Sequence, residues 1–134
     1  MARVQTGLET FHKTLPSRLA GTRIGLLSNT ASVDRSFRHA RHVIARHHPG
    51  KLTALFSPQH GFYSEKQDNM VESADGVDSD LQVPVFSLYG KTRQPSREMF
   101  DLIDVLFVDL QDVGTRVYTC LLYTSDAADE FCHG

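Results

Sequence analysis

The fold is indicated by a run of apolar residues, RIGLLS at 23–28, in which polar and apolar positions do not alternate. Three further runs of the same kind follow: LTALFS at 52–57, VPVFSLY at 83–89 and VLFVDL at 105–110. Nearly continuous apolar runs are typical of strands in a parallel sheet, which is covered on both faces. The sequence therefore predicts an α/β, Rossmann-like fold with a mostly parallel sheet and flanking helices, truncated after the fourth predicted strand.

Helices are expected in the segments that connect these strands. Apolar residues recur at helical spacing within 35–47, and Ser32 or Asp34 precedes that segment as a candidate N-cap. A second helix is expected over 4–15, and a short third one after the Pro-Ser pair at 95–96. These segments supply the layers that a parallel sheet requires.

Composition excludes several classes of protein. The 134 residues suit one globular domain, and 14 Lys and Arg against 16 Asp and Glu disfavour nucleic-acid binding. No apolar run approaches the roughly 20 residues of a membrane-spanning helix. Polar residues interrupt 1–11, where a secretory signal would need an unbroken apolar stretch, so we expect a cytoplasmic protein. Cys120 and Cys132 have no metal-binding or disulfide spacing.

Common nucleotide and nucleophile motifs are missing from the sequence. The first predicted strand leads into SNTAS at 28–32, which lacks the glycines of a dinucleotide-binding turn. Neither a P-loop nor a GxSxG nucleophile elbow occurs. We therefore expect neither a nucleotide cofactor nor a serine nucleophile.

Acidic residues gather where predicted strands end. A polar stretch at 58–82 is too long for an idle connection, and open α/β sheets bind ligands at the carboxyl ends of their strands. Carboxylates such as Glu65, Asp109 and Asp112 could supply the acid and base of a glycoside hydrolase. The alternative is that these acids are only solvated or cap backbone amides.

Five blocks of sequence carry a resemblance to a known family. They are VQTGLE at 4–9, GLLSN at 25–29, LFSPQHG at 55–61, VFSLYGKTR at 85–93 and DLQDVG at 109–114. In this order they resemble the exo-β-N-acetylmuramidase family of peptidoglycan-recycling glycosidases over about residues 3–119. The resemblance implies that 1–119 is a partial Rossmann-like N-terminal domain that forms an active-site cleft, and that a separate C-terminal domain is absent from this chain.

The implied activity is release of terminal N-acetylmuramic acid from peptidoglycan-derived muropeptides or disaccharides, with no metal or nucleotide cofactor. The candidate catalytic residues are Glu65, Asp109, Asp112 and His60. The candidate substrate-binding residues are Asn29, Gln59, Gln111, Arg116 and Tyr118. Arg116 could bind the lactyl carboxylate of the sugar through its guanidinium fork, or could instead pair with a neighbouring aspartate.

The sequence departs from the family pattern in two places. Many members have Glu where this chain has Gln59, and an amide cannot exchange a proton near neutral pH. Residues 120–134 do not continue the helix of the family and resemble translated sequencing-adaptor read-through, so we expect a non-native tail there. Two alternatives stay open: a non-catalytic sugar-binding Rossmann-like domain, and an inactive truncated fragment.

A cluster of histidines also lies within the predicted helix at 35–47 and just beyond it. His39, His42, His47 and His48 are interleaved with arginines, and cations repel a divalent metal ion. The sequence therefore predicts a solvated basic helix face there and no metal site.

Overall fold

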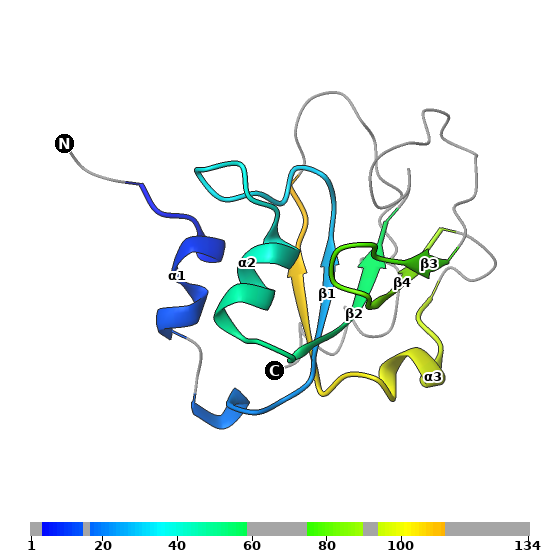
Figure 1. Cartoon of the computed structure of the whole chain (residues 1–134). Coiled ribbons are helices and arrows are strands. Elements are labelled where there is room, and N and C mark those ends of the chain that lie inside the picture. The colour runs from blue at the N-terminus through cyan, green and yellow to red at the C-terminus, as the bar shows by residue number, and fades with distance from the viewer. Residues whose placement is uncertain (1–3, 15–16, 59–74, 90–93, 112–134) are drawn as a thin grey trace, which may run out of the picture.

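A computed structural model describes residues 4–14, 17–58, 75–89 and 94–111 (Figure 1). Its elements, in chain order, are α1 (Gly7–Thr14), a 3-10 turn (Ser17–Leu19), β1 (Ile24–Ser28), α2 (Ala40–His47), β2 (Leu52–Ser57), β3 (Gly76–Val77), β4 (Pro84–Ser87), α3 (Arg97–Phe100) and β5 (Val105–Asp109). The four predicted strands are present as β1, β2, β4 and β5, and each lies within its predicted run.

The strands form one sheet in the order β3-β4-β2-β1-β5. β1 is parallel to both β2 and β5, and β2 is parallel to β4, which confirms the predicted α/β fold with a mostly parallel sheet. β3 is antiparallel to β4 and arises within the 58–82 stretch, where two residues are too few to give a strand pattern. The chain moves outward from β1 to β2 and β4 and then returns to the other side of β1 as β5. The order of the strands therefore reverses between β1 and β5, and ligands of open α/β sheets bind at such a reversal.

Alternate side chains of the strands form the two faces of the sheet. On one face Leu26 of β1 is in register with Leu55 of β2 and Phe107 of β5, and α1 and α2 lie against this face (Figure 1). On the other face Leu27, Ala54, Phe56, Leu88 and Ile103 form a second cluster, against which Met99 of α3 packs. On this face Val108 of β5 is 53% exposed.

The helix predicted over 35–47 begins five residues later, at Ala40, so the predicted start is wrong. Asp34 accepts hydrogen bonds from the backbone N–H groups of Ser36 and Arg38, at 2.8 Å and 2.9 Å, and this closes a turn. Phe37 within the turn has φ 57°, which no right-handed helix allows. The N-cap is His39, and neither Ser32 nor Asp34 has that role.

The helix predicted over 4–15 is α1, which begins three residues later, at Gly7, and α3 begins after the Pro-Ser pair as expected. At the start of α1, Thr6 N–H donates to the Glu9 carboxylate at 3.0 Å, and Glu9 N–H lies 3.4 Å from the Thr6 hydroxyl, which is a capping box. α3 starts after Ser96, whose hydroxyl accepts from Met99 N–H at 3.4 Å. Within the described ranges, no helix has the length and apolar character needed to cross a membrane.

Candidate active site

A row of polar residues crosses the sheet at the carboxyl ends of its parallel strands. Ser28 of β1 is in register with Asp109 of β5, and Ser57 of β2 is in register with Ser87 of β4. Ser28 and Ser57 also follow directly after a paired position, Leu27 with Phe56. The row lies one side-chain step beyond the apolar row that contains Leu26, on the same face. The apolar core therefore ends at this row, where the side chains of the same face become polar.

Asn29 joins the ends of β1 and β5. Its side-chain amide donates to the carbonyl oxygen of Gln111 at 2.8 Å, and its Oδ1 lies 3.5 Å from the Gln111 backbone nitrogen. The side chain is almost fully buried, with 2% of the residue exposed. One amide thus satisfies both backbone groups of Gln111, as a neighbouring strand would.

Asp109 carries the carboxylate at this junction. Its Oδ1 accepts a hydrogen bond of 2.6 Å from Nε2 of Gln111, and its backbone carbonyl accepts from the Ser32 hydroxyl. The Ser32 hydroxyl in turn accepts from the backbone N–H of Asn29 at 3.0 Å. The residue is only half-buried, so its carboxylate is ordered by neighbours and still reachable from solvent.

His39 supports the same loop from the start of α2. Its Nε2 lies 2.8 Å from the carbonyl oxygen of Asn29, and its Nδ1 accepts from the backbone N–H of Arg41 at 3.2 Å. Burial lowers the pKa of the His39 imidazole below its usual value, and the positive charges of Arg41 and His42 act in the same direction. The hydrogen bond with Asn29 and the charge of Asp109 oppose this shift.

The prediction of a solvated basic face on this helix is wrong for Arg41, which is buried, and holds only in part for the half-buried His39, His42 and His48. His39 is half-buried, and Arg41 is 8% exposed because its guanidinium lies 3.0 Å from the Asp78 carboxylate. Arg41 thus ties α2 to the segment between β3 and β4. No group of three metal-binding side chains occurs among residues 4–14, 17–58, 75–89 and 94–111.

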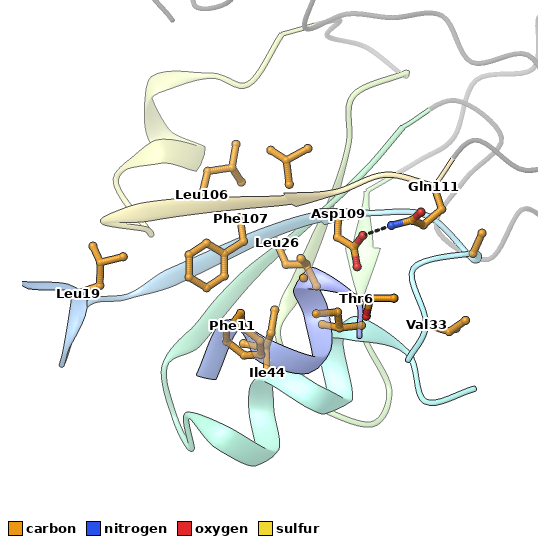
Figure 2. Close-up of a pocket in the computed structure, with 14 residues that line it drawn as sticks. Thr6, Phe11, Leu19, Leu26, Val33, Ile44, Leu106, Phe107, Asp109 and Gln111 are labelled. Atoms are coloured by element: carbon orange, nitrogen blue, oxygen red, sulfur yellow. Dashed lines mark hydrogen bonds between the residues drawn. The ribbon is translucent and has the colours of Figure 1, made fainter. Parts of the chain in front are cut away.

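A cavity of about 650 Å³ lies between β1, β5 and the two helices on their face. Most of its wall is apolar and includes Phe11, Leu26 and Phe107. Figure 2 shows Asp109 and Gln111 joined by their hydrogen bond at the end of the cavity away from Phe11. Because a sugar presents mainly hydroxyl groups, this polar end is the part that suits a carbohydrate.

The structure thus brings together three of the residues chosen from the sequence: Asn29, Asp109 and Gln111. The other six candidates, Gln59, His60, Glu65, Asp112, Arg116 and Tyr118, lie outside the described residues. Their assignments stay predictions.

Three residues at this edge of the sheet were not predicted as site residues from the sequence: Ser32, His39 and Asp75. Asp75 is exposed, and its Oδ1 accepts from the backbone N–H of Ser87 at the end of β4 at 2.8 Å. No spacing rule could identify it, since its place depends on the pairing of β3 with β4. The cap role of His39 was hidden by the unexpected turn at 34–38.

The sequence model of the N-terminal part of the exo-beta-N-acetylmuramidase NamZ matches residues 24–131. The chain belongs to this family. A curated protein, the peptidoglycan beta-N-acetylmuramidase NamZ of Bacillus subtilis (strain 168), is 41% identical over 131 residues, which are 96% of this chain and 31% of that protein. The NamZ match extends past residue 119, and the boundary that we expect there stays a prediction.

Two crystal structures of DUF1343 family proteins from Bacteroides fragilis NCTC 9343 are also similar. One has a TM-score of 0.70 and 35% identity, and the match covers 89% of this chain and 29% of that one. The other has a TM-score of 0.66 and 28% identity, over 98% of this chain and 33% of that one. The chain spans about a third of the length of the relatives that it matches.

Proposed function

We propose that this chain forms part of an exo-acting β-N-acetylmuramidase that releases terminal N-acetylmuramic acid from peptidoglycan-derived muropeptides or disaccharides. The observation that carries the proposal is the 41% identity to the Bacillus subtilis peptidoglycan beta-N-acetylmuramidase over 96% of the chain. The geometry at the carboxyl ends of β1 and β5 agrees with it. A carboxylate and two amide side chains meet there, at the reversal of strand order.

Asp109 supplies one of the two carboxylates that a glycoside hydrolase needs. The second cannot be Asp75, because β4 and β5 are three strand spacings apart in the sheet, about 14 Å. The two carboxyl groups of a glycosidase stand roughly 5–10 Å apart. Another acid must therefore act with Asp109.

We favour Asp112 as that second acid, with Glu65 as the other candidate. Asp112 is three residues beyond Asp109, and three residues span at most about 10 Å along the chain. Asp112 also follows directly after Gln111, whose backbone Asn29 binds from β1. In this assignment His60 orients the substrate or a carboxylate, and Gln59, Gln111 and Tyr118 contact the sugar.

The test is hydrolysis of a chromogenic N-acetylmuraminide by the complete gene product that contains this chain. Asp112→Asn should lower turnover by about 10²-fold, the usual scale for loss of a positioned acid or base. Asp101→Asn is the matched control, because Asp101 lies at the end of α3, before β5 begins. Wild-type turnover in Asp112→Asn would remove that residue from catalysis.

One observation favours a second function, a sugar-binding domain without catalysis. The family resemblance implies Glu in many members at the position of Gln59, and an amide can bind a sugar but cannot transfer a proton near neutral pH. Calorimetric titration with N-acetylmuramic acid and a turnover assay on the same protein separate the two functions. Binding without turnover supports the domain, whereas release of the chromophore supports the glycosidase.

A further inference from the structure

The imidazole of His39 has a different partner on each of its two ring nitrogens. Nδ1 accepts from the backbone N–H of Arg41, which caps the first turn of α2, and so cannot itself carry the proton. The proton of the neutral ring is therefore on Nε2, which donates to the carbonyl oxygen of Asn29 at 2.8 Å. The two partners fix both the tautomer and the orientation of the ring.

From Asn29 the hydrogen bonds continue to the carboxylate of the candidate active site. The Asn29 side chain binds the backbone of Gln111, and the Gln111 side chain donates to Asp109 at 2.6 Å. The Ser32 hydroxyl binds both the Asn29 N–H and the Asp109 carbonyl. The start of α2 is thus connected to Asp109 through the buried side chains of Asn29 and Ser32 and the exposed side chain of Gln111.

Protonation of His39 would break this arrangement. An imidazolium carries a hydrogen on each nitrogen, so Nδ1–H would face the Arg41 backbone N–H, and two donors would meet. Among the residues that the structure describes, the titratable or charged groups that act on the ring are Arg41 and His42 on α2, and Asp109 on β5. Partial burial and the positive charge of Arg41 favour the uncharged ring, and the carboxylate of Asp109 opposes them.

We propose that His39 is a positioning residue, which in its neutral form fixes the Asn29 loop and, through it, the site around Gln111 and Asp109. The Asp109 site is then correctly built only while His39 is uncharged. A catalytic consequence of this coupling rests on the proposed function, but the coupling itself does not.

The test is a pH titration of the isotopically labelled 134-residue chain by NMR, following the His39 ring and the backbone amides of Asn29 and Gln111. We expect the two amides to shift with the same midpoint as the ring, below the usual histidine value of about 6.5. In His42→Gln the midpoint should rise, because His42 lowers the pKa of the His39 ring, and the ring and the two amides should still share it. Amides that do not follow the His39 ring would overturn the proposal.

Two variants separate the link to Asn29 from the cap of α2. In His39→Gln the side-chain amide can still donate to the Asn29 carbonyl, so the Asn29 and Gln111 amides should keep their neutral-pH positions and lose the titration. In His39→Asn an acceptor for the Arg41 N–H remains, but the side chain is too short to reach Asn29, so both amides should be displaced at every pH. The opposite pattern would show that His39 acts only as a helix cap, and would reject the proposal.

Activity gives a readout that is independent of the NMR result. In the complete gene product, the kcat of the wild type should fall as the pH is lowered and His39 becomes charged. His39→Gln should retain turnover at neutral pH and should not show this fall. If no muramidase activity is found, the proposed function fails while the NMR coupling can still be observed. If activity is found without the coupling, only the inference about His39 fails.

Discussion

The side chain of Asn29 binds the backbone of Gln111, a residue 82 positions later in the chain. Both ends of the carboxamide take part, with distances of 2.8 Å to the carbonyl oxygen and 3.5 Å to the backbone nitrogen. The pairing of β1 with β5 is thereby extended past the last residues of the strands. A side chain determines the backbone path at the point where the carboxylate of Asp109 is presented.

Replacing Asn29 with Asp should destabilise the fold and disorder the site. A carboxylate cannot donate to the Gln111 carbonyl, which is then left without its partner, and the new charge lies close to Asp109. A loss of about 1–3 kcal/mol is the usual scale for an unpaired buried polar group. Urea denaturation measures the change.

Gln82→Glu is the matched control for this variant. The Gln82 amide also donates to a carbonyl, that of Ser79 at 2.8 Å, but the bond is exposed and spans only three residues. Its loss should change the free energy of unfolding by less than about 0.5 kcal/mol. Equal losses in both variants would show that the Asn29 amide has no special structural role.

Two buried serines at the candidate site should respond differently to alanine. Ser28 and Ser32 are both fully buried, but among the described residues the Ser28 hydroxyl has no hydrogen-bond partner. Ser32→Ala removes bonds to the Asn29 N–H and the Asp109 carbonyl and should cost about 1–3 kcal/mol. Ser28→Ala should be neutral or slightly stabilising, and a comparable loss in thermal unfolding experiments would contradict this account.

Gly25 in β1 should not tolerate a side chain. A Cβ at this position would lie 2.8 Å from Cδ1 of Ile103 and 3.1 Å from Cε2 of Phe56, both in the buried cluster on the α3 face. Gly25→Ala should therefore cost about 1–3 kcal/mol through overpacking. Gly7→Ala in the first turn of α1 meets nothing within 4 Å and should leave the melting temperature unchanged or higher.

The ion pair between Arg23 and Asp104 should make stability depend on pH in the acid range. Hydrogen bonds from the Arg23 side chain and backbone lower the pKa of Asp104 from 3.8 to about 2. A lowered carboxyl pKa gives stability that is fully present above the unfolded-state value, and that is lost as pH falls toward 2.

Asp104→Asn isolates this contribution. The urea midpoint of the wild type should exceed that of the variant by a constant amount above about pH 5, and the two should converge as the pH falls toward 2. Because both side chains are well exposed, added salt should also reduce the difference. A difference that is the same at pH 2 and pH 6 would show that the charge of Asp104 contributes nothing.

Arg116→Lys tests the proposed recognition of the lactyl group. An ammonium cannot form the two parallel hydrogen bonds that a guanidinium makes with a carboxylate. We expect kcat/KM to fall by about 10-fold or more for N-acetylmuraminides and less for N-acetylglucosaminides, which lack the lactyl carboxylate. Arg46→Lys on the exposed end of α2 serves as the control. Equal losses on both substrates would reject this role for Arg116.

The repeating burial of the strands was readable from the sequence. Residues such as Leu26 and Leu55 lie in apolar runs because both faces of a parallel strand are covered, and that requirement appears within a few neighbouring residues. The placing of Asp109 at the end of such a run already marked it as a candidate for the site. Local pattern thus determined the fold class and the four parallel strands, and it placed Asp109 at the candidate site.

Only the tertiary structure decided which residues meet at that edge. The bond of Asn29 to Gln111, the link of His39 to Asn29 and the position of Asp75 each depend on how separate segments are placed in space. The start of α2 was also decided in this way, because the turn at Asp34 competes with the helix for the same backbone N–H groups. Hydrophobic periodicity reports burial along one segment, whereas a hydrogen bond between segments depends on the registers of both.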